Sequence, residues 1–299
     1  MLAAALLTPA VLCGCSTRPP RIASAKGTLA AAPRADLGDL VNAAESRLPA
    51  AGGKVVVPPG TYKYSVPIRL KPRVYLEGYG ARLSYRGGGA AVRIEEDLKP
   101  PYLSGGLIGV TILGNPRSSA GVLQTDVTGA LYRDVVVWGF TGPRAAGIHV
   151  QNRGNGYDER TAFDRVSIGD CSIDLEFSNN GGTDSAGYTR IALLHLQVGN
   201  GQIGMLVRGP GLRLYNSEID ADVTEFLRPH GQPGTAIRVT DGARVTNDRF
   251  TIFGENAAGT SNGVGLSLGR GSVWQGWGTI HWSNLADKIA RGATLRVRP

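Results

Sequence analysis

The sequence predicts an all-β protein: a single right-handed parallel β-helix with an N-terminal capping helix. Six segments can be aligned on one template whose apolar residues fall mostly at positions 1, 3 and 6, and their starts lie 25, 31, 25, 21 and 33 residues apart. A period of twenty to fifty residues is typical of a solenoid, in which each unit buries its apolar face only against its neighbours. The six segments begin at Val110, Val135, Val166, Ile191, Leu212 and Val245.

A second series of apolar residues supports this register. A short strand rich in Val, Ile or Leu precedes each turn, and these strands are too short for a helical repeat of the same period. An antiparallel sandwich with chance repetition is the alternative. The inward residues of the second series are Val122, Ile148, Leu175, Met205, Ile237 and Leu266.

Composition indicates one large domain that carries a positive charge. The 299 residues include 43 glycines, which are spread along the repeats, and 42% apolar residues, enough for one core. The net charge of +8 favours a polyanionic partner such as an acidic polysaccharide. Because the charges are dispersed and no aromatic residues alternate with basic clusters, we expect no binding to nucleic acid.

The first 35 residues are typical of an exported protein. Residues 1–15 form a short apolar run, and their end, Leu12-Cys13-Gly14-Cys15, resembles a bacterial lipobox. That resemblance implies that Cys15 becomes the lipid-modified first residue. The protein would then contact the membrane only through this lipid anchor. Residues 16–35 are polar and read as a flexible tether. We therefore expect a cell-surface lipoprotein or a secreted protein, with 36–299 as the β-helix domain.

The expected ends of the β-helix cover its open turns. Residues 36–48 have helical spacing with Asp36 as N-cap, and this helix would cover the first turn. Residues 273–277 predict one more irregular turn. A short helix over 283–291 and a strand over 294–297 are expected to close the second end. Cys171, at an inward template position, is expected to be a buried apolar residue.

Two motifs near the N-terminus carry a family resemblance. Residues 55–62, Val-Val-Val-Pro-Pro-Gly-Thr-Tyr, and residues 76–80, Leu-Glu-Gly-Tyr-Gly, follow the expected capping helix. This order resembles the opening of the pectate-lyase-like superfamily, which includes polygalacturonases, rhamnogalacturonases and phage tailspikes. The resemblance implies a right-handed parallel β-helix that acts on polysaccharide. The Asn-Thr-Asp, Asp-Asp and Gly-His-Gly signatures of the polygalacturonases do not occur, so their mechanism is not carried over.

Candidate catalytic residues come from one outward template column. Asp170, His195, Asn216 and Arg249 fall at the same template position, with Glu218 in the neighbouring column. Asp170 and Glu218 would be an acid/base pair, with His195 between them as a proton relay. Arg249 and Asn216 would bind the substrate, because a guanidinium holds a sugar carboxylate in two hydrogen bonds. A purely structural polar ladder is the alternative interpretation.

Two longer insertions are expected to wall the groove. Residues 152–160 bring Tyr157, Glu159 and Arg160, which we expect to bind substrate. Residues 220–230 include Asp220 and Asp222, whose alternation would suit Ca²⁺ if the protein is a lyase. No other metal and no cofactor is expected. Solvated loop charge is the simpler interpretation of both insertions.

The leading functional hypothesis is a polysaccharide-degrading enzyme, a hydrolase or a lyase, that acts in a groove along the β-helix. The alternatives are a non-catalytic carbohydrate-binding or surface-structural β-helix and an epimerase of polymer-bound uronic acids. The sequence leaves the glycan and the oligomeric state open.

Overall fold

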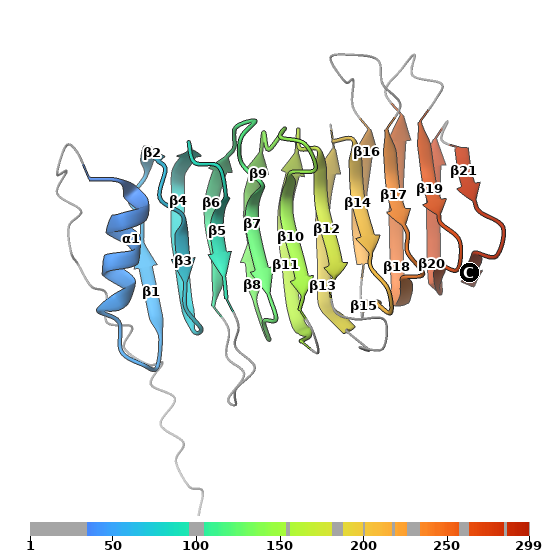
Figure 1. Ribbon diagram of the computed structural model, residues 1–299, viewed down its shortest axis with the longest axis horizontal. Coiled ribbons are helices and arrows are strands. Elements are labelled where there is room, and N and C mark those ends of the chain that lie inside the picture. The colour runs from blue at the N-terminus through green and yellow to red at the C-terminus, as the bar shows by residue number, and fades with distance from the viewer. Residues whose placement is uncertain are drawn as a thin grey trace, which may run out of the picture.

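The chain forms a right-handed parallel β-helix, as predicted. This computed structural model describes residues 35–95, 105–153, 156–180, 188–199, 201–216, 219–225, 234–256, 263–283 and 286–298. Within these ranges every named strand pairing is parallel. Figure 1 shows the turns stacked side by side from α1 to β21.

Two sheets make up the wall of the β-helix in the described chain. The 13-stranded sheet, here sheet A, contains β1 (Gly53–Val56), β2 (Gly60–Tyr64), β4 (Val74–Tyr85), β6 (Gly106–Leu113), β8 (Leu131–Arg133), β9 (Val136–Trp138), β11 (Asp158–Gly169), β13 (Tyr188–Gly199), β15 (Arg213–Asn216), β16 (Ile219–Glu225), β18 (Arg244–Asn256), β20 (Val273–Ser283) and β22 (Thr294–Arg298). The nine-stranded sheet, here sheet B, contains β3 (Ile68–Leu70), β5 (Ala90–Ile94), β7 (Ala120–Thr125), β10 (Ala146–Asn152), β12 (Ile173–Asn179), β14 (Ile203–Arg208), β17 (Thr235–Val239), β19 (Val264–Leu268) and β21 (Ala286–Ile289).

A bend divides sheet A into two stretches in each turn. The pairing of β4 with β6 shifts register between Glu77 and Ala81, and that of β11 with β13 shifts between Phe163 and Val166. Residues at the bend adopt positive φ, among them Gly109 at 68° and Asp134 at 53°. Such irregularities turn the strand direction sharply, so the sheet wraps around the core.

The strand pairing confirms the predicted register of one apolar series throughout and that of the other only in part. In sheet B the predicted register is confirmed along its length, since Val122, Ile148, Leu175, Met205, Ile237 and Leu266 pair in succession. In sheet A the prediction holds for Ile112, Val137 and Ile168. It is wrong beyond them, because Val166 pairs with Leu196 instead of Ile191. The bends change the number of residues between equivalent positions of successive turns. A template of fixed spacing therefore aligns the wrong residues in this part of sheet A.

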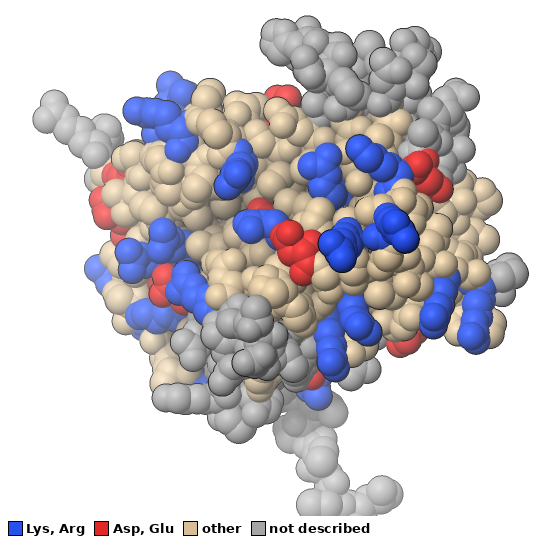
Figure 2. Space-filling model, turned by 45° about the vertical axis from the view of Figure 1, so that its right-hand side comes forward, with Lys and Arg blue, Asp and Glu red and all other residues tan. Residues whose placement is uncertain are grey.

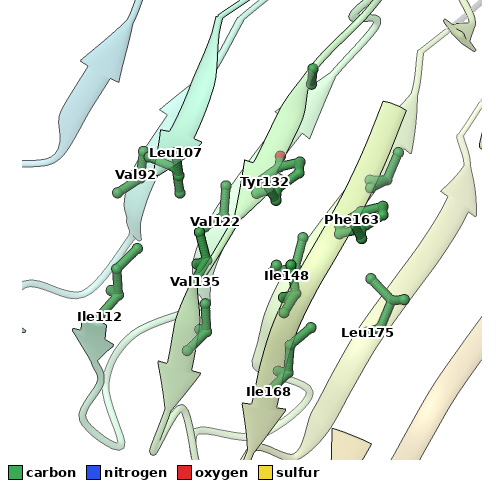
Figure 3. Packing of buried hydrophobic residues seen from close by; sticks show 14 of the residues in the cluster. Val92, Leu107, Ile112, Val122, Tyr132, Val135, Ile148, Phe163, Ile168 and Leu175 are labelled. Atoms are coloured by element: carbon green, nitrogen blue, oxygen red, sulfur yellow. The ribbon is translucent and has the colours of Figure 1, made fainter. Parts of the chain in front are cut away.

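The core fills the space between the sheets with stacked apolar side chains. Figure 3 shows Val122, Ile148 and Leu175 of sheet B opposite residues of sheet A. The rings of Tyr132 and Phe163 stack with centroids 4.8 Å apart and planes 5° from parallel. Cys171 is buried in this core, as predicted. Each turn therefore stabilises the next through residues that repeat at the same position.

The helix α1 (Leu37–Ser46) covers the first turn, as predicted. The N-cap Asp36 accepts a hydrogen bond from the backbone of Gly38 at 2.8 Å. Side chains of the helix also serve the edge strand β3: Asn42 accepts from the backbone N–H of Arg69 at 2.8 Å, and Glu45 accepts from that of Lys71. The helix thus satisfies donors that an uncovered edge would leave exposed.

The second end differs from the prediction. Residues 286–289 form the strand β21, so the expected helix over 283–291 is wrong, whereas β20 and β22 confirm the expected last turn and final strand. The strand β21 continues sheet B by pairing with β19. Leu295 and Val297 of β22 remain 39% exposed.

Candidate functional site

The predicted catalytic column does not form. Asp170 follows β11 in the turn toward sheet B, and its neighbour Gly169 pairs with Gly199, four residues beyond His195. His195 pairs with Asp220 in the backbone register, and its side chain lies outside the described residues. Burial raises the pKa of Asp170, which is half-buried in its turn. Asp170 and His195 are therefore not neighbours on consecutive turns.

Asn216 faces the interior, which contradicts its predicted outward position. Its side chain is 2% exposed and donates to Asn247 Oδ1 at 2.8 Å, and Asn247 donates to the backbone oxygen of Gln275 at 3.3 Å. Asn216 and Asn247 thus form a buried polar ladder at the bend. Asn216 therefore supports the turn and does not face a groove.

The other predicted site residues are scattered. Arg249 is exposed and lies in the register shift of β18, two residues beyond the partner of Asn216. Tyr157 and Glu159 are half-buried, and Arg160 is exposed, near the start of β11. Glu218 and Cys15 lie outside the described residues. The predicted 220–230 loop begins as strand, because β16 extends to Glu225, and the side chains of Asp220 and Asp222 are not described.

A cluster of charged side chains does form on the outer face of sheet B. The residues that follow the inward series point outward, so His149 of β10 pairs in register with Glu176 of β12. Glu176 in turn pairs with Leu206 of β14, which pairs with Arg238 of β17. The outer face of sheet B thus brings an imidazole, a carboxylate and guanidinium groups onto consecutive turns.

Glu176 is the centre of this cluster. Its side chain is only 3% exposed, although it lies on the outer face of the sheet. Arg208 Nε donates to Glu176 Oε1 at 2.5 Å, and His149 Nε2 lies 3.7 Å from the same oxygen. A buried carboxylate is tolerated only when it is paired, and Arg208 supplies that pairing from the next turn.

His149 lies beside Glu176 on the preceding turn and is neutral. Burial lowers the pKa of His149, an effect that Arg208 reinforces and that the carboxylate of Glu176 only partly opposes. The ring nitrogen Nε2 lies 2.7 Å from Ser178 Oγ, so the hydroxyl and the imidazole share a hydrogen bond. His149 is therefore hydrogen-bonded to Ser178 beside Glu176, and the charge of Glu176 is balanced by Arg208.

A groove of about 420 Å³ opens in front of Glu176. Its floor is partly apolar, with Ile173, Ile203 and Leu206. Its charged lining consists of Arg144, Arg208 and Arg238 against Glu176 and Asp241. Arg238 is anchored by a 3.0 Å hydrogen bond to Thr235 Oγ1. An apolar floor with a few fixed charges is typical of a ligand site.

The groove is basic in a molecule whose surface is also basic. Figure 2 shows one face on which Lys and Arg side chains clearly outnumber Asp and Glu, in keeping with the net charge of +8. Three guanidinium groups against two carboxylates leave the lining with an excess positive charge. A ligand that carries carboxylate or sulfate groups is therefore favoured over a neutral one.

The sequence contained the information that locates this cluster. The second apolar series aligns sheet B correctly, and the residue after each inward position yields the column Leu123, His149, Glu176, Leu206, Arg238 and Ser267. The predicted catalytic column came from the first series, in which the bends shift the alignment. The burial of Glu176 and its contact with Arg208, in contrast, depend on side-chain packing that the register alone does not specify.

The described residues contain neither a metal-binding cluster nor a membrane-spanning helix. There, no group of three or more His, Cys, Asp or Glu side chains is placed to hold a metal ion. No helix in the described ranges has the length and apolar character that crossing a membrane requires.

The architecture is a right-handed parallel β-helix, the fold that the N-terminal motifs led us to expect. No family model and no curated protein matches the sequence. Among solved structures, the chain is similar to the A-modules of two mannuronan C-5 epimerases of Azotobacter vinelandii. The AlgE4 module is 16% identical, with 89% of this chain and 94% of that chain covered and a TM-score of 0.40. The AlgE6 module is 17% identical, with coverage of 89% and 96% and a TM-score of 0.33.

A third similar structure is the tailspike protein gp49 of the Acinetobacter baumannii bacteriophage Fri1, a capsular polysaccharide depolymerase. It is 12% identical, with 86% of this chain and 59% of that chain covered and a TM-score of 0.33. By their names these proteins act on polysaccharides. The likeness is one of general architecture, and the chemistry of this chain has to be derived from its own groove.

Proposed function

We propose that this protein binds an acidic polysaccharide in the groove of sheet B and acts on it by abstracting a proton next to a uronate carboxylate. The observation that carries the proposal is the buried Glu176 carboxylate in the lining of a groove that Arg144 and Arg238 also line. Arginine binds carboxylates in paired hydrogen bonds, so these two arginines would hold the uronate groups of a polymer.

The division of roles follows from position. Glu176 lines the groove, whereas His149 lies on the preceding turn, 3.7 Å from Glu176 Oε1, and is not part of the lining. Glu176 would accept the proton from C5 of the sugar, and Arg238 or Arg144 would neutralise the charge that develops on the sugar carboxylate. Arg208 holds Glu176 in place, and His149 positions it.

The first step serves two reactions. The electron pair left at C5 can form a C4–C5 double bond while the C4–O bond breaks and the leaving oxygen takes up a proton, which is β-elimination. Return of a proton to the opposite face of C5 is epimerisation. Hydrolysis is less well supported, because it uses two carboxylates that flank the bond. The second carboxylate of this lining, Asp241, is exposed and accepts a hydrogen bond from Thr240 at 3.1 Å.

The test is incubation with polyuronates and neutral glucans in D₂O. Absorbance of an unsaturated uronate would identify elimination, and deuterium at C5 without chain cleavage would identify epimerisation. New reducing ends with neither signal would contradict the proposal in favour of hydrolysis. Binding of polyuronate without any reaction would leave a carbohydrate-binding β-helix and would contradict the catalytic part.

Two arginines of sheet B make a matched pair for this test. Arg238 lines the groove, whereas Arg69 of β3 is exposed on the same sheet near the capping helix. Arg238→Ala should raise KM for a polyuronate by about tenfold to a hundredfold, the usual worth of a hydrogen bond to a charged group. Arg69→Ala should leave KM unchanged. Equal effects of the two variants would show that general surface charge, and not the groove, binds the polymer.

We also propose export to the cell surface with Cys15 as the lipid-bearing residue. The support is the lipobox-like end of the apolar run at residues 12–15. Cys15→Ala should release the protein from the membrane fraction. Wild-type protein that is already soluble and begins downstream of Cys15 would contradict the anchor.

A further inference from the structure

A second hollow lies on sheet A, near the C-terminal end of the β-helix. It has a volume of about 270 Å³ and its lining includes Thr246, Gln275, Trp277, Arg296 and Arg298. None of its lining residues belongs to the groove of sheet B. The two hollows are therefore separate features of the surface.

The register of sheet A explains which side chains face this hollow. Tyr215, Thr246, Gln275 and Arg296 pair in succession across β15, β18, β20 and β22. The residues before them on the three inner strands, Leu214, Val245 and Trp274, are buried in the core. Because neighbouring residues of a strand point to opposite faces, the column from Tyr215 to Arg296 points outward.

Two aromatic residues on this face are exposed. Trp277 is 55% exposed and Tyr215 is 39% exposed. Two turns and two residues separate them, about 12 Å between their Cα positions from the spacing of strands and residues. Large aromatic side chains exposed together on a flat sheet are more often a binding surface than a chance feature.

The backbone is built to turn Trp277 outward. Gly276 and Gly278 flank it with φ of 156° and 147°. A Cβ atom at Gly276 would lie 2.3 Å from the backbone oxygen of Asn247, so only glycine fits there. A Cβ atom at Gly278 would likewise meet the backbone oxygen of Phe250. The two glycines thus let β20 pass close to β18, with the indole of Trp277 exposed between them.

The charges around the indole select for an anion. The guanidinium carbon of Arg298 lies 5.4 Å from the centroid of the Trp277 ring, and Arg296 lines the same hollow. Arg213 and Arg244, also exposed, lie on the preceding strands of this face. Asp248 is the only carboxylate of the lining. Gln275, which donates to Thr246 at 3.2 Å, adds amide and hydroxyl groups that pair with sugar hydroxyls.

We propose that this surface, from Tyr215 to Trp277 with Arg296 and Arg298, is a second, non-catalytic binding site for acidic saccharides. The apolar face of a sugar ring would stack on Trp277, and the arginines would bind its carboxylate or sulfate groups. This inference shares its ligand class with the proposed function but uses different residues. A polymer held here as well as in the groove would bind more tightly through effective concentration.

The test measures binding of a polyuronate in a Glu176→Gln background, where turnover does not consume the polymer. Trp277→Ala should weaken binding about tenfold, the order expected for one stacked ring, and Trp277→Phe should retain most of it. Tyr79→Ala is the matched control, because Tyr79 is 53% exposed on sheet A but donates to Asp134 Oδ2 at 3.0 Å near the other end. Melting temperatures establish that each variant is folded.

The outcomes separate the two proposals. Weaker binding with Trp277→Ala, with Tyr79→Ala unchanged, supports the second site whatever Arg238→Ala does. Unchanged binding with Trp277→Ala overturns the second site and leaves the groove untouched. If Trp277→Ala changes the oligomeric state in sedimentation and leaves polymer binding unchanged, the surface is a contact between two copies, and the inference is wrong.

Discussion

Two ladders of charged side chains cross consecutive turns of this β-helix, and they differ in burial. On sheet B, His149, Glu176 and Arg208 form the groove cluster, in which Glu176 is 3% exposed. At the bend of sheet A, Asp134 pairs with Arg165 at 2.7 Å, and their side chains are 31% and 61% exposed. The bend ladder also joins Tyr79 to Asp134.

A ladder of charged side chains on a β-helix does not by itself indicate a functional site. Parallel stacking brings like positions together on every face, so charged ladders arise wherever a column is polar. At the bend such a ladder stays in water and ties one turn to the next. In the groove, a carboxylate that lines a hollow is buried away from water. Burying a charge costs free energy, so a buried carboxylate at a hollow is a candidate for a functional group.

The largest expected effect concerns turnover. Glu176→Gln keeps the shape of the side chain but removes the base, so turnover of a polyuronate should fall by about a hundredfold to ten-thousandfold. Asp134→Asn in the bend ladder should leave turnover unchanged. Steady-state kinetics of both variants, with melting temperatures as the control for folding, make the comparison. Equal losses would refute the distinction between the two ladders.

A third carboxylate, that of Asp158, is buried, and no cation pairs with it in the part of the chain that the structure describes. Asp158 begins β11 and accepts hydrogen bonds at Oδ1 from Gln124 and from the backbone of Val127, while Oδ2 has no partner. Burial raises the pKa of Asp158 to about 7, an effect that the hydrogen bonds oppose and that nearby Asp126 increases. Glu176, in contrast, is paired with a cation, the guanidinium of Arg208.

The sign of the pH effect follows from this raised pKa. In the unfolded chain Asp158 loses its proton near pH 4, but in the folded protein it keeps the proton until about pH 7. The folded state therefore binds more protons between these values, and its stability decreases as pH rises through that window. The loss should approach about 4 kcal/mol above pH 7.

Asp158→Asn tests this effect. The variant should match the wild type near pH 4 and be more stable above pH 7, as measured by urea unfolding across the pH range. Glu159→Gln, a change at the half-buried neighbour, is the control. A variant that is less stable than the wild type at neutral pH would show that the ionised carboxylate is needed.

The smallest effect is expected at the bend ladder itself. Asp134→Ala removes the partner of both Tyr79 and Arg165, yet exposed ion pairs contribute roughly 0 to 1 kcal/mol. Arg165 lowers the pKa of Asp134 despite a small opposing effect of burial, so the contribution should fade at low pH and at high salt. A loss well above that range, insensitive to salt, would mean that the ladder is a major stabilising element.

The fold was predictable because it rests on period and capping. The apolar series placed Val122, Ile148 and Leu175 in register, and Asp36 marked the start of the capping helix. The site could not be predicted in the same way, because an error of one or two residues in the register moves side chains to another face or turn. Asn216 was expected outside and lies inside. Asp170 and His195 were expected as neighbours, and the irregular bend of β11 separates them.

The central claim is that the groove of sheet B binds and transforms an acidic polysaccharide, and a crystal structure of the Glu176→Gln variant soaked with an oligouronate tests it most directly. Slow turnover should preserve the ligand. We expect a sugar ring over Ile203 and Leu206, with its carboxylate on Arg238 or Arg144 and C5 facing residue 176. If an oligouronate at saturating concentration binds only elsewhere and solvent fills the groove, the proposed function is wrong.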